Sequence, residues 1–292
     1  MNIGWIGTGI MGSSMCANLM RAGYALRVHT RTQSRARSLI DAGAQWCASP
    51  AEVVSGSEVV FSIVGLPRDV EEVFLTPTGL IPNAREGTIL VDMTTSTPSL
   101  ARDLYISAIE KGVHVLDAPV SGGDVGAREG TLAIMVGGDR EPYDRVLPLF
   151  EHLGRTISHM GGAGAGQHTK MANQIMIAST MIGVVESLLY AFKAGLDRNA
   201  VIDIIGTGAA GAWSLNNLGR RIVNEDFSPG FLIKHFIKDM GIALNEARRM
   251  NLALPGLSLA CQFYQAASAL GFEELGTQGL YRVFQTLNNV SG

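Results

Sequence analysis

Three glycines near the start of the chain have the spacing of a phosphate-binding turn. Gly7, Gly9 and Gly12 form a GxGxxG pattern between a short apolar stretch and an apolar face at helical spacing. The first glycine permits a tight turn, the second lets the backbone approach a diphosphate, and the third lets the helix pack close to the sheet. The helix N-terminus adds free N–H groups. We therefore expect a dinucleotide to contact Gly7, Thr8, Gly9, Ile10, Met11 and Gly12.

A second stretch has the same spacing in a different context. Gly206, Gly208 and Gly211 follow a segment that starts at a plausible cap, Asp197, and fits a short helix. Because a GxGxxG pattern alone is a weak signal, the surrounding elements decide its meaning. We interpret the second triplet as a helix end followed by a loop.

The end of the second predicted strand, residues 25–29, indicates which nicotinamide dinucleotide binds. An NAD site places a carboxylate there for the ribose hydroxyls, whereas an NADP site needs a cation for the 2′-phosphate. The segment after this strand contains Arg31 and Thr32 but no Asp or Glu. Arg31 can stack on the adenine and contact the phosphate, with Thr32 as a hydroxyl donor. The sequence favours NADP. NAD stays open, since Arg31 and the following Arg35 and Arg37 would also suit the solvated face of a helix.

A lysine near the start of a long helical pattern, residues 166–194, is the candidate proton donor. Lys170 follows a glycine-rich junction, and Asn173 and Gln174 lie at i+3 and i+4 on the same helical face. A helical lysine is usually solvated, yet the neighbours of Lys170 are small and apolar. A lysine near a developing alkoxide supplies both a proton and a positive charge. We predict that Lys170 is catalytic.

Other candidate residues follow predicted strands. In an open parallel sheet the carboxyl ends of the strands form the ligand crevice. Leu66 and Pro67, after the strand at 59–64, and Thr95, after the strand at 88–92, are therefore candidates for lining the cofactor. The run Ser121-Gly122-Gly123 offers backbone N–H groups and a hydroxyl to a small carboxylate. We expect a polar loop after it, and then an extra strand within residues 130–138.

Composition narrows the class of protein. The chain has 292 residues, 47% of them hydrophobic, and a net charge of −3, so no basic field attracts nucleic acid. The three cysteines are scattered and the six histidines lack ligand-spaced partners, so neither disulfides nor a metal is expected. The first strand begins too early to leave room for a targeting segment, and no apolar run is expected to span a membrane. We expect a cytoplasmic protein that has no nucleic-acid or membrane partner.

The order of elements predicts two domains. Strands and helices alternate in residues 1–163, which is typical of a Rossmann-type doubly wound sheet that binds NADP. Residues 164–292 read as an all-α domain for substrate binding and oligomerisation, opened by the long interdomain helix. Its helices are expected at 197–206, 214–223, 233–250, 257–270 and 275–287. Because several of its faces are apolar, we expect a homodimer or homotetramer.

Taken together, these motifs resemble the β-hydroxyacid dehydrogenase family over essentially the full length of the chain. Four blocks carry the resemblance. They are the run from Gly7 to Leu19, the run Asp117-Ala118-Pro119-Val120-Ser121-Gly122-Gly123, the run from Gly166 to Asn173, and Lys238-Asp239 with Phe231 ahead of them.

The resemblance implies a role for each block. It makes Lys170 the acid/base and Asn173, or its neighbour Gln174, a residue that orients substrate. It assigns the substrate carboxylate to the Ser121-Gly122-Gly123 loop. It also places Phe231 and Asp239 in the substrate site and Lys238 near the cofactor.

The implied activity is reduction of a small aldehyde acid by NADPH. Within the family the chain is most similar to tartronate semialdehyde reductases and to glyoxylate and succinic semialdehyde reductases. An NAD-dependent 3-hydroxyisobutyrate-type dehydrogenase is the alternative, and 6-phosphogluconate dehydrogenase, whose α-domain is much longer, resembles the chain less. A non-catalytic NADP-binding module would be expected to have lost the lysine.

Overall fold

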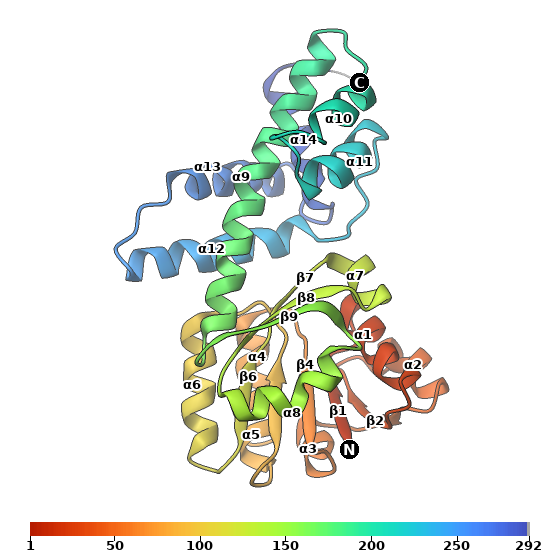
Figure 1. The fold of residues 1–292 in the computed structure, drawn as a ribbon, viewed down its shortest axis with the longest axis vertical. Helices are drawn as coiled ribbons and strands as arrows, with labels where there is room; N and C mark the ends of the chain where they lie inside the picture. The colour runs from red at the N-terminus through yellow and green to blue at the C-terminus, as the bar shows by residue number, and fades with distance from the viewer. Residues whose placement is uncertain (291–292) are drawn as a thin grey trace. The chain divides into compact units, whose positions relative to one another are not determined.

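The computed structural model of the chain describes residues 1–290, which form two compact units dividing between Lys170 and Met171. Figure 1 shows a sheet flanked by helices in the first unit and helices alone in the second. The long helix α9 (Ala165–Lys193) begins in the first unit and continues into the second. The boundary expected at residues 163 and 164 stays a prediction.

The first unit is built on one mixed sheet of nine strands. Its order is β3-β2-β1-β4-β5-β6-β8-β7, and β9 pairs with β8. The pairs from β3 to β6 are parallel, β8 is antiparallel to β6 and β7, and β9 is parallel to β8. The strands are β1 (Ile3–Ile6), β2 (Leu26–His29), β3 (Gln45–Trp46), β4 (Val59–Ser62), β5 (Ile89–Asp92), β6 (His114–Asp117), β7 (Val120–Ser121), β8 (Leu132–Gly137) and β9 (Gly154–Gly161).

The register of the parallel strands brings their carboxyl ends level. Neighbouring strands pair at their last residues, so one row runs His29, Ile6, Ser62, Asp92, Asp117. The segments that leave these strands therefore start at one edge of the sheet. This is the edge at which open parallel sheets bind ligands.

Both faces of the sheet are buried, which explains why its central strands are apolar runs. Ile3 and Trp5 of β1 belong to one core cluster, whereas Ile6 belongs to a second. The same division separates Phe61 from Val60 in β4, because successive side chains point to opposite faces. Trp5 also stacks on Phe61 with ring centroids 5.5 Å apart.

Two helices of the first unit, α3 and α6, begin at a residue whose side chain caps the helix. Ser49 accepts a hydrogen bond from the Glu52 amide at the start of α3, and Thr97 accepts one from the Leu100 amide at the start of α6. The helices are α1 (Ile10–Arg21), α2 (Arg37–Asp41), α3 (Pro50–Ser55), α4 (Pro67–Leu75), α5 (Leu80–Asn83), α6 (Pro98–Ile109), α7 (Gly123–Glu129) and α8 (Arg140–Phe150), with a 3₁₀ turn at Gln33–Ala36.

The expectation of a polar loop after Gly123 is wrong, because α7 occupies this segment. Its tertiary setting compensates for a weakly helical sequence. The side-chain amide of Asn18 in α1 donates a hydrogen bond of 2.9 Å to the carbonyl of Ala127. The helix then ends at Gly130, which adopts the left-handed conformation that glycine accepts without strain.

The second unit contains α9 beyond Lys170 and the helices α10 (Arg198–Ile205), α11 (Arg220–Val223), α12 (Ile233–Arg249), α13 (Pro255–Ala269) and α14 (Leu280–Leu287). A π-helical segment, Ser214–Gly219, precedes α11, and a 3₁₀ turn, Thr277–Gly279, precedes α14. In the core of this unit, the rings of Phe236 and Tyr264 pack edge-to-face with their centroids 5.0 Å apart. The second glycine triplet follows α10 as expected, since Gly206 is the C-cap of that helix.

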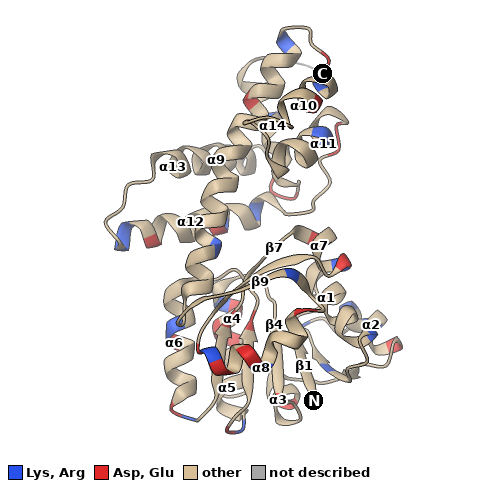
Figure 2. Cartoon of the chain, in the orientation of Figure 1, with Lys and Arg blue, Asp and Glu red and all other residues tan. Residues whose placement is uncertain are grey.

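The expectation that no apolar run could span a membrane is wrong by length and composition, because α9 is long and apolar enough. Figure 2 shows few charged positions along this helix. In the second unit its buried residues, such as Met181, Val185 and Leu188, belong to the core cluster. Packing in this core accounts for part of the apolar sequence of α9, whereas Met176 and Tyr190 of the same helix are exposed.

A Rossmann-type sheet followed by an all-α part with a long helix, as the sequence predicts, is confirmed.

Candidate active site

The turn between β1 and α1 has the geometry that its glycines predict. Gly7 has φ +91°, and an added Cβ would lie 2.1 Å from the carbonyl oxygen of Ile63. At Gly12 an added Cβ would lie 2.2 Å from the Gly7 carbonyl oxygen. Only glycine therefore allows the turn and the close approach of α1.

The same turn fits an anionic diphosphate. An added Cβ at Gly9 would meet nothing within 4 Å, so the backbone there faces open space. Gly9 is the N-cap of α1, with no side-chain cap and no acidic residue in the first turn of the helix. The hydroxyl of Thr8 is buried without a hydrogen-bond partner in residues 1–290. Free helix N–H groups and an available hydroxyl match the diphosphate of a dinucleotide. Ile10 and Met11 form the first turn of α1.

Arg31 and Thr32 follow β2 at the same edge of the sheet. The Arg31 side chain is 76% exposed, and its Nη1 lies 3.2 Å from Oδ1 of Asp69. Asp69 is nearly buried, and its Oδ2 accepts a hydrogen bond of 3.0 Å from the Leu66 amide. Asp69, which the sequence reasoning missed, thus joins Arg31 to the segment after β4.

The candidates after β4 and β5 occupy the start of α4 and the loop before α6. Leu66 is the N-cap of α4 and Pro67 its first residue. Thr95 lies between Thr94, whose hydroxyl accepts a hydrogen bond of 2.9 Å from the Val64 amide, and Ser96, whose buried hydroxyl has no partner in the described part of the chain. These segments begin at one edge because their strands end in register.

The Ser121-Gly122-Gly123 loop joins β7 to α7. Gly122 and Gly123 have φ +131° and +64°, backbone conformations that favour glycine. Gly122 is the N-cap of α7 without a side-chain cap. The loop therefore presents backbone donors beside the Ser121 hydroxyl, the donor set expected for a small carboxylate.

Lys170 lies against this loop. Its side chain is 7% exposed, and its Nζ donates a hydrogen bond of 2.7 Å to the carbonyl of Val120, the residue before Ser121. A lysine held in this way is not the freely solvated residue that is common on helices. The candidate proton donor and the candidate carboxylate site thus meet within the first unit.

Two buried residues that the sequence reasoning left unassigned fix the start of α9. The Asp117 carboxylate accepts hydrogen bonds from the amides of Gly164 and Gln167, at 2.7 and 2.8 Å. Gln167 bonds in turn to the segment after β5. The sequence feature that could have identified Asp117 is its position at the end of an apolar strand, directly before Ala118-Pro119.

The remaining candidates lie in the second unit, on α9 and at the start of α12. The Gln174 amide donates a hydrogen bond of 2.6 Å to Oδ2 of Asp239 and accepts one of 2.8 Å from Asn173. Lys238 lies 3.0 Å from Oδ1 of the same buried aspartate. Phe231 precedes α12 and packs edge-on against Phe236, with ring centroids 5.7 Å apart. The second unit thus brings four polar candidates into one connected cluster.

The structure places the predicted residues in two groups, one in each unit. In the first unit, the glycine turn, Arg31, Leu66, Pro67 and Thr95 follow neighbouring strands, and Lys170 adjoins the serine-glycine loop. Within residues 1–290, no group of three or more His, Cys, Asp or Glu side chains is placed to hold a metal ion.

Comparisons with known proteins define the class. Residues 2–162 match the family model described as the NAD-binding domain of 6-phosphogluconate dehydrogenase. Residues 164–284 match the model described as the NAD-binding domain of NADP-dependent 3-hydroxyisobutyrate dehydrogenase.

Individual relatives agree with the family models. The chain is 53% identical over 290 residues to an Arabidopsis thaliana protein named "probable 3-hydroxyisobutyrate dehydrogenase-like 1, mitochondrial", covering 99% of this chain and 86% of that one. It is 38% identical to the 2-hydroxy-3-oxopropionate reductase of Escherichia coli K12, covering 99% of both. The solved structure of Mycobacterium tuberculosis 3-hydroxyisobutyrate dehydrogenase with L-serine superposes with a TM-score of 0.87 at 31% identity, covering 98% of each chain.

Fold, glycine turn and relatives together define an NAD(P)-dependent oxidoreductase that acts on CH–OH groups. Within that class, the chain belongs to the β-hydroxyacid dehydrogenase family, which confirms the resemblance seen in its motifs.

Proposed function

We propose that the protein reduces a small aldehyde acid to the hydroxy acid, with NADPH as the preferred cofactor and Lys170 as the proton donor. The substrate class is that of tartronate semialdehyde, glyoxylate or succinic semialdehyde. The bound NADPH supplies the hydride. The 38% identity to a 2-hydroxy-3-oxopropionate reductase supports this substrate class.

One observation carries the proposal: Lys170 Nζ donates to the Val120 carbonyl at 2.7 Å, beside the serine-glycine loop. A carboxylate bound by Ser121 and the amides of Gly122 and Gly123 brings the rest of a short substrate next to the ammonium. Lys170 then donates its proton to the carbonyl oxygen as negative charge develops. Fixing both ends of a small substrate also supplies the orientation that hydride transfer needs.

The second unit contains the other candidate residues. Asn173 and Gln174 follow Lys170 by three and four positions on α9, so helical spacing gives the three residues one face. We assign substrate orientation to Asn173 and Gln174, and substrate contact to Phe231 and Asp239. Lys238 is assigned to the cofactor. The buried hydrogen bond between Gln174 and Asp239 supports a fixed arrangement of these polar groups.

The preference for NADPH rests on Arg31. Its guanidinium is largely exposed at the end of β2 and suits a 2′-phosphate, and no acidic residue occupies the segment after this strand. The match of residues 164–284 to a model named for an NADP-dependent enzyme also supports it.

A specific observation also favours a second candidate, an NAD-dependent 3-hydroxyisobutyrate-type dehydrogenase. The relative at 53% identity carries a 3-hydroxyisobutyrate dehydrogenase-like name. The ion pair between Arg31 and Asp69 moreover gives the guanidinium a carboxylate partner, which competes with a phosphate.

A substrate panel tests the proposal. We expect loss of NADPH absorbance with glyoxylate, tartronate semialdehyde or succinic semialdehyde, and lower efficiency for 3-hydroxyisobutyrate oxidation with NAD. The reverse ranking would establish the second candidate. Binding of NADPH without turnover of any acid in the panel would indicate a non-catalytic NADP-binding module.

We also propose that the chain forms a homodimer or homotetramer and acts in the cytoplasm. Large apolar side chains of the second unit, such as Tyr190, Ile204 and Trp213, are exposed in the single chain, which supports their burial by another copy. Light scattering coupled to size exclusion measures the oligomer, and a monomer at micromolar concentration would contradict it. Cell fractionation tests the location.

A further inference from the structure

The start of α9 is fixed to the sheet by a buried carboxylate. Oδ1 of Asp117 accepts a hydrogen bond of 2.7 Å from the Gly164 amide, and Oδ2 accepts one of 2.8 Å from the Gln167 amide. Helix N-termini leave N–H groups without intrahelical partners. Asp117 satisfies two amides at this N-terminus from the end of β6, and its negative charge matches the positive end of the helix dipole.

A second buried side chain strengthens the same attachment. Gln167 has no exposed surface. Its Oε1 accepts a hydrogen bond of 3.0 Å from the Ser96 amide, and its Nε2 donates one of 2.7 Å to the Thr94 carbonyl. The first turn of α9 is therefore held by the ends of two neighbouring strands, β5 through Gln167 and β6 through Asp117.

The backbone packs closely around this turn. An added Cβ at Gly166 would lie 2.4 Å from the Met135 carbonyl oxygen, and one at Gly137 would lie 2.7 Å from the Gly166 amide nitrogen. Lys170 follows Gln167 by three residues, less than one helical turn. The position of its ammonium beside Val120 therefore depends directly on where this turn sits.

We propose that Asp117 is a positioning residue for Lys170: its carboxylate holds the first turn of α9 against the sheet edge and thereby places the lysine beside the serine-glycine loop. The proposal rests on the proposed function of Lys170 as the proton donor. Asp117 contacts no reacting atom in this scheme and acts through the backbone of Gly164 and Gln167.

The ionisation of Asp117 gives the proposal a signature in pH. Burial raises the pKa of Asp117 to about 6, although the hydrogen bonds from backbone amides act in the opposite direction and lower this pKa. The charged and titratable groups on its own strand and on the elements around it include His114 of β6, Asp92 of β5, His168 and Lys170 of α9, and Arg102, Asp103 and Tyr105 of α6. A protonated carboxyl group loses acceptor strength toward the two amides, so acid should loosen the turn and reduce turnover.

Stability should change in the opposite direction over the same range of pH. The folded pKa of Asp117 is above the unfolded value of about 3.9, so the folded state binds more protons between these values. The contribution of this group to stability is therefore complete below about pH 3.9 and is lost as the pH rises through about 6. Turnover that rises while this contribution falls would distinguish positioning of Lys170 from a purely structural role.

The test compares Asp117→Asn with the wild type and with Leu149→Ala, a core change on α8. The asparagine amide can accept from one N–H group through its oxygen but cannot replace the second acceptor oxygen. We expect Asp117→Asn to lower kcat by about 100-fold, the cost of a displacement near 1 Å, and to bind NADPH within about twofold of the wild type. It should also lose the acid limb of the kcat profile near pH 6. Leu149→Ala should lower the melting temperature but keep the wild-type kcat and acid limb.

The outcomes separate this proposal from the function on which it rests. If Lys170→Ala is inactive while Asp117→Asn keeps the wild-type kcat and acid limb, the positioning role is wrong and the proton donor stands. If Lys170→Ala retains wild-type turnover, the proposed function fails whatever Asp117 does. Should Asp117→Asn not fold, the wild-type profile decides: a kcat that is flat from about pH 5 to pH 7 while the fold persists would overturn the proposal.

Discussion

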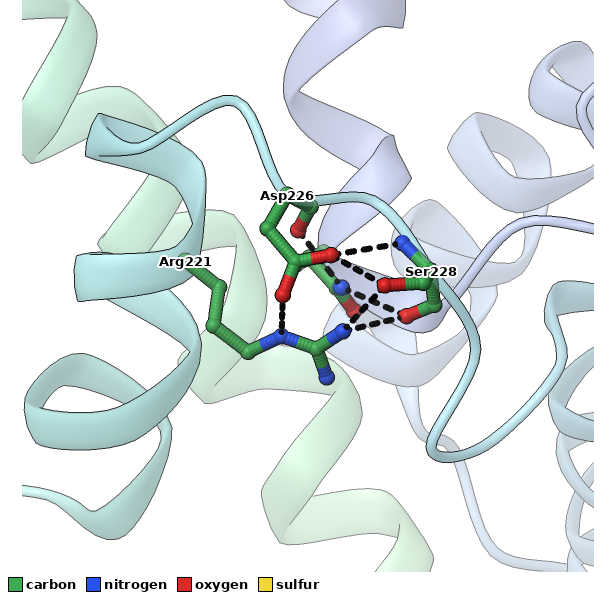
Figure 3. Close-up of polar contacts among 4 residues, drawn as sticks. Arg221, Asp226 and Ser228 are labelled. Atoms are coloured by element: carbon green, nitrogen blue, oxygen red, sulfur yellow. Dashed lines mark hydrogen bonds and ion pairs between the residues drawn. The ribbon is translucent and has the colours of Figure 1, made fainter.

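Two aspartates, one in each unit, both accept hydrogen bonds through their carboxylates, yet their pKa values are shifted in opposite directions. Asp117 is buried, and desolvation raises its pKa despite two backbone amide donors. The Asp226 side chain is 45% exposed, and hydrogen bonds from Arg221 and Ser228 hold its pKa well below its usual range. Figure 3 shows Arg221, Asp226 and Ser228 joined at the loop after α11.

The difference teaches what each network does. A carboxylate loses favourable hydration when it is buried, even if it accepts hydrogen bonds from backbone amides. In the first unit, this buried carboxylate fixes the first turn of α9, which contains Gln167, three residues before Lys170. The exposed network in the second unit fastens the loop between α11 and α12 and costs little solvation. We therefore expect changes at the sheet edge of the first unit to alter rates and binding, and changes in the exposed network to alter stability alone.

The largest expected effect follows removal of Lys170. Lys170→Ala should lower reduction by about two to four orders of magnitude, the usual contribution of general acid–base catalysis, and leave NADPH binding nearly unchanged. Lys170→Arg keeps the positive charge but transfers no proton, so it should be nearly as impaired. Steady-state kinetics and NADPH fluorescence titration measure the two quantities.

Lys193→Ala is the matched control, because Lys193 ends the same helix and is exposed. It should keep wild-type turnover. A Lys170 variant with more than about a tenth of normal turnover, well above the hundredfold loss expected at minimum, would make Lys170 a bystander and Asp239 the next candidate acid.

Arg31 is expected to give the next largest effect, on cofactor choice. A charge-assisted hydrogen bond to phosphate contributes about 1.5–3 kcal/mol, so Arg31→Ala should reduce the preference for NADPH over NADH by about 10- to 150-fold. The measurement is kcat/KM with each cofactor. Asp69 pairs with the same guanidinium in the free protein, so the contribution of Arg31 to phosphate binding is reduced by the loss of this ion pair.

Arg37→Ala serves as the control for Arg31, since the Arg37 guanidinium pairs with Asp41 at 2.9 Å on α2. It should leave cofactor choice unchanged. Equal efficiency of the unmodified protein with NADPH and NADH would refute the NADP assignment.

How well the sequence predicted these regions depends on how far apart the interacting residues lie. The glycine turn and α9 were predictable, because strand, spacing and helical periodicity are local signals. The bonds from Asp117 to Gly164 and Gln167 span 47 and 50 residues, and the ion pair of Arg31 with Asp69 spans 38. No periodicity connects such pairs, so their partners became visible only in the fold.

Local composition also misled where tertiary contacts decide the conformation. The segment after Gly123 contains Gly126 and several polar residues and was predicted as a loop. The hydrogen bond from Asn18 to Ala127, 109 residues apart, helps to hold it as α7 instead. In the second unit the expected helix at 214–223 contains a π-helical start, which side-chain periodicity does not reveal.

Ser121 should affect binding more than chemistry. Ser121→Ala removes one hydroxyl donor to the substrate carboxylate, and a hydrogen bond to a charged group contributes about 1.5–3 kcal/mol, so KM for acids should rise by about tenfold or more. Turnover should fall less than KM rises. Simple aldehydes without a carboxylate should be poor substrates for the wild type, and their efficient reduction, unaffected by Ser121→Ala, would count against the carboxylate role. Ser107→Ala on the exposed side of α6 is the control.

The smallest expected effect belongs to the exposed network. Asp226→Ala removes the acceptor of Arg221 and of the Ser228 amide, but an exposed ion pair contributes only about 0–1 kcal/mol. We expect a fall in melting temperature of about 4 °C or less at neutral pH and unchanged kinetic constants.

The pH dependence of that fall tests the comparison between the two aspartates. The folded pKa of Asp226 is lower than the unfolded value of about 3.9, so its contribution to stability is fully present above about pH 3.9 and is lost as the pH falls through the folded pKa. The difference in melting temperature between wild type and Asp226→Ala should therefore be constant from neutral pH down to about pH 5 and should narrow in stronger acid. Asp117→Asn should differ from the wild type with the opposite trend, since burial places the folded pKa of Asp117 above its unfolded value. If the difference in melting temperature from the wild type followed the same pH dependence for both variants, burial would not be what makes the pKa shifts of Asp117 and Asp226 differ.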